Sequence, residues 1–285
     1  MADAILSLLN DRWKQHFRQK EGSYDMIPTP FATVNDKIKG FKKGELILIA
    51  SRPGMGKTTL ALQIAIESAP VEKQLFVSLD NDKGWISDKV ISQLENQSFG
   101  DIQSGKLREE IDVLSMMDSA LIKAAKRGFD TQFNLKSLRS IEKLLDIKHY
   151  DLLIIDWFQM LTCEIDDPSL DLIEVVRELK RIVKQKNVAI ILTGNVSWMV
   201  EERGGDKRPV LSDIRCPEEA EEYFDKVFML YRPEYYDITE DWEGNSTKNV
   251  AELYLVKNKS GGLFSVSLKI DENFTQFYEE ELKLY

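Results

Sequence analysis

Short apolar runs that alternate with segments of helical spacing constrain the fold of this chain more than any other feature of its sequence. Four runs, at residues 46–50, 75–77, 152–155 and 188–192, contain only apolar residues. Strands that are apolar along their whole length suit a parallel sheet with helices on both faces. The segments expected to form those helices are 57–68, 84–96, 107–127, 135–147 and 170–186. This alternation predicts a doubly wound α/β domain with a mostly parallel, twisted sheet.

The C-terminal part of the chain has a different pattern. Residues 226–232, 250–258 and 263–270 are expected to be strands with little helix between them. The segment 257–262 joins two of these strands and contains two adjacent glycines, as a hairpin tip does. We therefore predict a C-terminal β-hairpin that extends the sheet.

The N-terminal segment is expected to be separate from this domain. An apolar stripe at helical spacing predicts a helix, and its members are Ile5, Leu8, Leu9, Trp13 and Phe17. Gly22, Pro28 and Pro30 interrupt the pattern that follows. We therefore divide the chain into a helix and linker at 1–32 and a main domain at 33–285. The helix packs either on its own domain or on a neighbouring subunit.

Composition excludes several classes of protein. The chain has 38 basic and 48 acidic residues, a formal net charge of −10, so it is not expected to coat nucleic acid, although a local basic patch can still bind it. Its two histidines argue against a Ser-His-Asp hydrolase or a histidine-rich metal site, and its two cysteines do not have metal-ligand spacing. No apolar run approaches the roughly 20 residues of a membrane helix, and the N-terminus does not have the pattern of a signal peptide. We expect a cytoplasmic protein that does not bind membranes.

The strongest motif lies directly after the first apolar run. Residues 51–59, here called the phosphate loop, read Ser51-Arg52-Pro53-Gly54-Met55-Gly56-Lys57-Thr58-Thr59 and precede a predicted helix. This is the pattern of a phosphate-binding loop: glycines let backbone amides point at phosphate, and the helix N-terminus adds positive potential. Lys57 is expected to contact the β- and γ-phosphates, and the Thr58 hydroxyl to bind Mg²⁺. The sequence therefore predicts a site for a nucleoside triphosphate and Mg²⁺.

Three polar residues follow other apolar runs. Asp156 ends the run 152–155 and is expected to orient Mg²⁺, while Asp80 is a candidate to polarise the attacking water. Asn195 follows the run 188–192 and is a candidate sensor of the γ-phosphate. Because ligands bind at the carboxyl ends of strands in open α/β sheets, all three belong at one edge. Alternatively, Asp80 is a loop cap or a turn residue, and Asn195 belongs to a turn.

Basic residues mark two further segments. A long charged loop contains Arg203, Lys207 and Arg208 and leads to Arg215; it is either a functional loop or a solvated one. Lys257 and Lys259 point the same way on a strand, so they either act as cations on a neighbour's nucleotide or discourage sheet aggregation.

The order of these motifs resembles the C-terminal motor domain of the DnaB family of bacterial and phage replicative helicases. The resemblance covers nearly the whole chain. The segments that carry it are 29–31, 40–46, 51–59, 78–80, 102–107, 155–160, 206–209, 212–215, 231–236 and 257–261.

This resemblance implies a RecA-like P-loop NTPase that uses ATP and Mg²⁺, assembles as a hexameric ring and moves on single-stranded DNA. It implies that the N-terminal helix docks on the adjacent subunit, and that a primase or a helicase loader is a partner. We expect 285 residues to leave no room for the family's N-terminal primase-binding domain. Asp80 stands where the family has a catalytic Glu, Asn195 where it has a Gln, and Lys257 and Lys259 where it has a Lys and an arginine finger. Arg215 begins the family's DNA-binding pore loop, and Arg232 with Tyr235 are candidates for the adenine pocket.

The chain also departs from the family pattern. Asp80 and Asn195 are each one methylene shorter than the residues they replace, and Lys259 lacks the two-pronged guanidinium of Arg. After Arg215, Pro217 lacks an amide donor, and four glutamates between 218 and 222 would repel a phosphate backbone. Two functions therefore stay open: an ATP-driven helicase motor, and a degenerate nucleotide-binding regulator or assembly partner with weak or no helicase activity. A filament-forming recombination mediator ranks third, and a small-molecule kinase ranks last.

Overall fold

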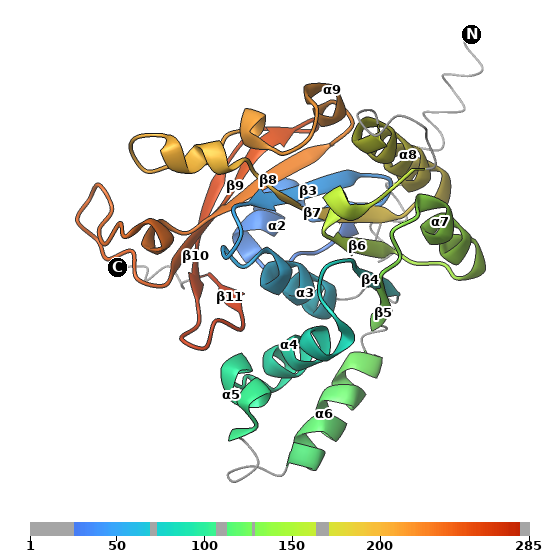
Figure 1. Ribbon diagram of the computed structural model, residues 1–285, viewed down its shortest axis with the longest axis horizontal. Helices are drawn as coiled ribbons and strands as arrows, with labels where there is room; N and C mark the ends of the chain where they lie inside the picture. Colours follow the sequence, from blue (N-terminus) through green and yellow to red (C-terminus); the bar gives the residue numbers. More distant parts are fainter. Residues whose placement is uncertain (1–25, 69–72, 107–112, 127–128, 164–170, 280–285) are drawn as a thin grey trace.

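The computed structural model describes residues 26–68, 73–106, 113–126, 129–163 and 171–279. Within them a nine-stranded sheet has helices on both faces (Figure 1). The strand order is β11-β10-β9-β8-β3-β7-β6-β4-β5. The strands are β3 (Leu46–Ser51), β4 (Gln74–Ser78), β5 (Phe129–Phe133), β6 (Leu152–Asp156), β7 (Ala189–Asn195), β8 (Lys226–Tyr231), β9 (Val250–Asn258), β10 (Ser265–Ile270) and β11 (Phe277–Tyr278).

Neighbouring strands from β8 to β5 in this order pair in parallel, whereas β9, β10 and β11 pair antiparallel. A separate two-stranded sheet joins β1 (Met26–Ile27) to β2 (Phe41–Lys42). The α-helices are α2 (Ala32–Ile38), α3 (Lys57–Glu67), α4 (Lys83–Glu95), α5 (Phe99–Ser104), α6 (Val113–Lys126), α7 (Leu138–Ile147), α8 (Asp171–Lys186) and α9 (Glu218–Glu221).

Alternate residues of each central strand enter different cores. Leu46 and Leu48 of β3 pack with α7 and α8, whereas Ile47 and Ile49 pack with α2, α3 and Ile86 of α4. Successive side chains of a strand point to opposite faces, so an unbroken apolar run fills both layers. Figure 1 shows the sheet between these two groups of helices.

The predicted α/β class, the mostly parallel sheet and the C-terminal hairpin of β9 and β10 are confirmed. The sequence does not predict the two-residue strands β1, β2 and β11, nor the longer β5. Three of the five β5 residues, Phe-Asp-Thr-Gln-Phe, are polar, and among the described strands β5 pairs with β4 alone. The helix expected at 107–127 is α6, over Val113–Lys126, and residues 107–112 lie outside the described ranges. The shorter α5 precedes it.

The N-terminal helix expected within residues 1–25 also lies outside the described residues. Part of the expected linker, however, belongs to the domain. Ile27 and Phe31 are 2% and 1% exposed and join the same core as β3. The packed domain therefore begins upstream of residue 33.

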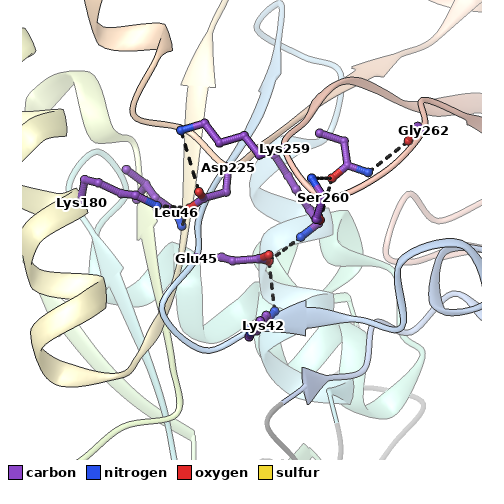
Figure 2. Close-up of polar contacts among 10 residues, drawn as sticks. Lys42, Glu45, Leu46, Lys180, Asp225, Lys259, Ser260 and Gly262 are labelled. Atoms are coloured by element: carbon purple, nitrogen blue, oxygen red, sulfur yellow. Dashed lines mark hydrogen bonds and ion pairs between the residues drawn. The ribbon is translucent and has the colours of Figure 1, made fainter. Parts of the chain in front are cut away.

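Asp225 ties three elements together at the amino ends of β3 and β8. Its carboxylate accepts the Leu46 amide at 2.8 Å and pairs with Lys180 of α8, and its amide donates to the Leu46 carbonyl at 2.8 Å. Its backbone carbonyl accepts the Lys259 amide at 2.9 Å, so the tip of the β9–β10 hairpin is bound as well. Figure 2 shows Lys180, Leu46 and Lys259 converging on Asp225.

We expect Asp225→Asn to lower the free energy of unfolding by about 3 kcal/mol, because it leaves the Lys180 ammonium without its counter-ion in a site where both side chains are about 15% exposed. Urea denaturation measures the change. Asp146→Asn is the matched control: the Lys186–Asp146 pair is more exposed, and its loss should cost less than about 1 kcal/mol. Equal losses in the two variants would contradict the anchoring role of Asp225.

Candidate functional site

The carboxyl ends of four parallel strands surround a cavity of about 460 Å³. Lys57 and Thr58 reach it after β3, Asp80 after β4, Asp156 at the end of β6 and Asn195 at the end of β7. These residues come from separate segments of the sequence and were expected to form one site. In the structure they line one cavity. Its lining residues are Pro53, Gly54, Gly56, Lys57, Thr58, Thr59, Asp80, Asn81, Trp85, Lys89, Asp156, Trp157 and Asn195.

The phosphate loop has the backbone that its glycines permit. Gly54 and Gly56 have φ values of +81° and +97°, in the region that favours glycine. A Cβ on Gly56 would lie 2.8 Å from the Phe277 ring, and one on Gly54 would lie 3.1 Å from the Tyr235 ring. The loop therefore requires both glycines for its conformation and for its packing against the C-terminal segments.

Lys57 begins α3 and turns back over the loop. Its ammonium donates to the Ser51 hydroxyl at 3.0 Å and to the Arg52 carbonyl at 3.1 Å. Burial lowers the pKa of Lys57 to about 8, against the opposing effect of Asp156. An anion in the cavity would supply the negative charge that this buried ammonium lacks.

Thr58 and Asp156 form the oxygen pair expected for a metal. The Thr58 hydroxyl donates to Asp156 Oδ2 at 2.9 Å, and the Thr193 hydroxyl donates to Oδ1. Asp156 is 3% exposed; burial raises its pKa, while both hydroxyls and Lys57 lower it. A hydroxyl and a carboxylate fit Mg²⁺, which proteins commonly hold with few side chains and the phosphates of a nucleotide. Within the described residues no cluster of three or more acidic, histidine or cysteine side chains could hold a metal ion.

Gln159 was not singled out from the sequence, and it links two of the residues that were. Its side-chain oxygen accepts the Asn195 amide at 3.2 Å, while its nitrogen donates to the Asn195 carbonyl at 3.1 Å and the Arg215 carbonyl at 3.4 Å. The Arg215 amide also donates to the Asn195 carbonyl at 3.0 Å. The end of β7 at the cavity is thereby joined to the start of the expected DNA loop.

The remaining members of the phosphate loop support its shape. Arg52 pairs with Glu201 at 2.8 Å, Ser51 is buried, and Met55 is 1% exposed in the core. These three are not among the described residues that line the cavity, whereas Pro53 and Thr59 are.

Arg232 also lies outside that lining, with its guanidinium 5.0 Å from the centre of the Phe274 ring. Its role toward adenine stays a prediction, as does that of Tyr235, which lies against Gly54.

Of the four cations expected to bind DNA, three have partners in their own chain. Arg203 pairs with Asp213 at 2.6 Å, and Lys207 lies 5.4 Å from the centre of the Tyr236 ring. Arg208 pairs with Glu252 and lies between the rings of Tyr231 and Tyr254. Arg215 is exposed, and no ion pair involves it within the described part of the chain. Arg215 is therefore the cation best placed to meet an external anion.

Lys257 and Lys259 lie at the opposite edge of the sheet from the phosphate loop. β9 runs antiparallel to β8, and Val227 near the start of β8 faces Lys257. Val227 in turn pairs with Leu48 of β3, so Lys257 lies three residues, or roughly 10 Å along the strand direction, before the end of β3, and Lys259 lies further back. Both lysines donate to their own chain, Lys257 to the Glu221 carbonyl and Lys259 to the Glu222 carbonyl. At this distance they do not reach the phosphate loop of their own subunit.

The sequence assigns no role to four residues of the cavity lining, and one of them, Asn81, directly follows Asp80. Trp85 and Lys89 are four residues apart in a predicted helix, so the sequence predicts that they share one face of it. It does not predict that this face lies beside the phosphate loop. Trp157 follows Asp156 and could have been expected near the cavity from its position alone.

The comparisons with known proteins agree with this geometry. Residues 26–279 match the family model of the DnaB-like helicase C-terminal domain. The chain is 31% identical over 273 residues to a probable replicative DNA helicase of Trieres chinensis, covering 90% of this chain and 58% of that protein. It is 26% identical over 277 residues to a probable plasmid replicative DNA helicase of Chlamydia psittaci, covering 94% of this chain and 58% of that protein. The chain thus spans less than two thirds of the length of these relatives.

Solved structures confirm the RecA-like fold. The ATPase domain of G40P has a TM-score of 0.83 at 22% identity, covering 96% of this chain and 99% of that one. A DnaB-like replicative helicase, described with its interactions with primase, has a TM-score of 0.81 at 22% identity, covering 99% and 67%. The RadB recombinase has a TM-score of 0.56 at 16% identity, covering 90% and 100%. Across the described ranges, every helix is too short or too polar to span a membrane.

If Asp80 is the general base of an ATP-hydrolysing site, we expect Asp80→Glu to raise the steady-state rate about tenfold, because the longer side chain extends further into the cavity. Asp36→Glu is the matched control, since it makes the same change at an exposed carboxylate outside the cavity lining. An unchanged rate in Asp80→Glu would assign the general base to another residue.

Proposed function

The chain belongs to the DnaB-like helicase C-terminal domain family, and we propose that it is an ATP-driven motor that unwinds DNA in replication. The observation that carries this proposal is the convergence of Lys57, Thr58, Asp156, Asp80 and Asn195 on one cavity. Together they supply the groups that phosphoryl transfer to water requires: a cation for the phosphates, ligands for Mg²⁺, a carboxylate for the water and an amide for the γ-phosphate. A glycine turn before a core helix would need none of the three residues outside the phosphate loop.

In the proposed reaction, the buried Lys57 ammonium contacts the β- and γ-phosphates of ATP. Thr58 and Asp156 would hold Mg²⁺, which would supply positive charge to screen the phosphates. Asp80 accepts a proton from the attacking water, and Asn195 contacts the γ-phosphate. Gln159 then transmits the position of Asn195 to Arg215 through the hydrogen bonds that it makes to both backbones.

The proposed assembly is a hexameric ring in which Lys257 and Lys259 complete the nucleotide site of the next subunit. Their place at the far edge of the sheet supports this assignment, because it separates them from their own phosphate loop. Arg215 contacts the phosphates of single-stranded DNA, with a weaker contribution from Arg203, Lys207 and Arg208. A primase or a helicase loader is the proposed protein partner.

A second candidate function is a degenerate nucleotide-binding regulator or assembly partner. Its specific support is the ion pairing of Arg203 and Arg208 within the chain, together with the acidic turn of α9 that follows Arg215. These features weaken the attraction of this surface for a phosphate backbone.

Steady-state ATP hydrolysis with and without single-stranded DNA separates the two functions. A several-fold stimulation by DNA, abolished in Lys57→Ala, is the result expected of a motor. Binding of ATP with negligible turnover that DNA does not change would establish the regulator instead. Lys83→Ala, which removes an exposed lysine outside the cavity, is the matched control for Lys57→Ala.

We expect Lys259→Ala to abolish most of the turnover of the assembled protein, since a cation supplied by a neighbour is worth at least about a thousandfold in such enzymes. Mixing Lys259→Ala with Lys57→Ala should restore activity, because one subunit then provides an intact phosphate loop and its neighbour an intact hairpin. Lys248→Ala, at another exposed lysine, should need no such complementation. Failure of the mixed assembly to regain activity would contradict action between subunits.

We expect Gln159→Glu to reduce the stimulation of ATP hydrolysis by DNA about tenfold while leaving the rate without DNA within about twofold. The carboxylate cannot donate to the Asn195 and Arg215 carbonyls, so the link between them is lost. Gln132→Glu makes the same change at an exposed position on β5 and should leave the stimulation unchanged. A parallel fall of both rates would show that Gln159 supports the fold rather than the coupling.

A further inference from the structure

Residues 275–279, here called the C-terminal segment, pack against the elements that surround the phosphate loop. They include the two-residue strand β11, which pairs antiparallel with β10 at the edge of the sheet. Thr275 and Phe277 are 0% and 1% exposed, whereas Tyr278 is 49% exposed. Alternation of buried and exposed side chains is the pattern of a strand with one face against a core. The segment therefore presents Thr275 and Phe277 to the interior of the domain.

Two buried glutamines bind the backbone of this segment. Gln63 of α3 donates to the Phe277 carbonyl at 2.7 Å, and its side-chain oxygen accepts the Phe277 amide at 2.8 Å. Gln93 of α4 donates to the Thr275 carbonyl at 2.9 Å and to the Thr59 carbonyl at 2.8 Å. Because buried backbone groups need hydrogen-bond partners, Gln63 does for Phe277 what a further strand would do.

Glu279 binds the end of the segment to a third helix. Its carboxylate accepts the Thr33 amide at 3.0 Å, in the first turn of α2. The segment is thus bound at three alternate residues, Thr275 by α4, Phe277 by α3 and Glu279 by α2. These bonds on both sides of Phe277 and at its own backbone fix the position of its side chain.

The ring of Phe277 packs directly on Gly56 of the phosphate loop, where a Cβ would lie 2.8 Å from it. Gly56 has a φ of +97° and directly precedes Lys57, the first residue of α3. A glycine does not hold such a conformation by itself, because its backbone populates many others about as readily. Successive amides of a loop bind phosphate together only in one conformation. The packed ring supplies the restraint that the glycine lacks.

We propose that Phe277 is a positioning residue of the phosphate loop, whose ring holds Gly56 and the start of α3 in the conformation that binds phosphate. Phe277 is not among the described residues that line the cavity, whereas Gly56 and Lys57 are, so it acts through the loop and not on the ligand. Gln63 acts in turn through Phe277, because it holds the backbone that carries the ring. This inference rests on the proposed function only in that the cavity binds a nucleotide.

The test measures binding of a fluorescent ADP analogue at a temperature where thermal unfolding shows each variant to be folded. Phe277→Leu keeps an apolar side chain and removes the ring. Its affinity for ADP should fall about tenfold, the result when the free loop adopts the binding conformation for about a tenth of the time. Phe224→Leu is the matched control: it removes an equally buried ring from the core on the other face of the sheet and should keep wild-type affinity.

A second variant tests whether Gln63 acts through Phe277. Gln63→Met removes both hydrogen bonds to Phe277 and should also weaken ADP binding. The double variant Gln63→Met/Phe277→Leu should bind ADP no more weakly than Phe277→Leu alone, whereas additive losses would overturn the assignment of Gln63. Gln74→Met, at a buried glutamine that donates to the Ser68 carbonyl, is the matched control and should keep wild-type affinity.

Hydrogen exchange measures the same coupling from the other end. Coupling between two sites is reciprocal, so ADP should slow exchange in the wild-type peptide that contains Phe277 more than in the peptide that contains Phe224. This comparison uses wild type and so decides the question even where Phe277→Leu does not fold. Equal slowing in the two peptides would overturn the proposal.

Lys57→Ala separates failure of this inference from failure of the proposed function. It should abolish ADP binding; if it does not, or if wild type does not bind ADP, the assignment of the cavity as a nucleotide site fails. If Lys57→Ala loses binding while Phe277→Leu unfolds at a lower temperature with wild-type affinity, Phe277 only stabilises the fold, and the proposal for Phe277 alone is overturned.

Discussion

The parallel hydrogen bonding of the six strands from β8 to β5 is the constraint on which the rest of the structure depends. Parallel strands end at the same edge, so segments more than a hundred residues apart bring Lys57, Asp80, Asp156 and Asn195 to one cavity. The antiparallel return of β9 has the opposite effect and carries Lys257 and Lys259 to the other edge. The direction of pairing therefore divides the cations of this subunit between two surfaces, which is the division that a site shared between subunits requires.

The sequence was sufficient for the parts of the fold that depend on periodicity. Buried runs such as 46–50 and 152–155 identify central strands because a strand apolar on both faces has few alternatives. This criterion does not identify β5, because a strand at the edge of the sheet tolerates polar residues such as Asp130 and Gln132. Ile27 and Phe31 were assigned to a linker because Pro28 and Pro30 interrupt periodicity, although their side chains are buried beside β3. The pattern of neighbouring residues in the sequence does not predict such long-range packing.

The candidate site shows the same limit. Motifs identified the residues at strand ends, since the position of an Asp or Asn after an apolar run implies an edge of the sheet. Gln159 and Phe277 were missed because their significance comes from what they contact: two backbone carbonyls for Gln159 and Gly56 of the phosphate loop for Phe277. The sequence also does not show which charged residues form ion pairs, so it could not predict that Arg203 pairs with Asp213 and Arg208 with Glu252.

The contacts of the hairpin have a consequence for selectivity. Lys259 donates to the neutral Glu222 carbonyl and lies 4.0 Å from the carboxylate of Asp225. The side chain is 45% exposed, and an ammonium has three donors, so Lys259 can meet an outside acceptor without giving up these contacts. Its own acceptors already lower the gain from a neutral group, whereas an anion adds a full charge interaction. The tip of the hairpin therefore favours anionic over neutral partners.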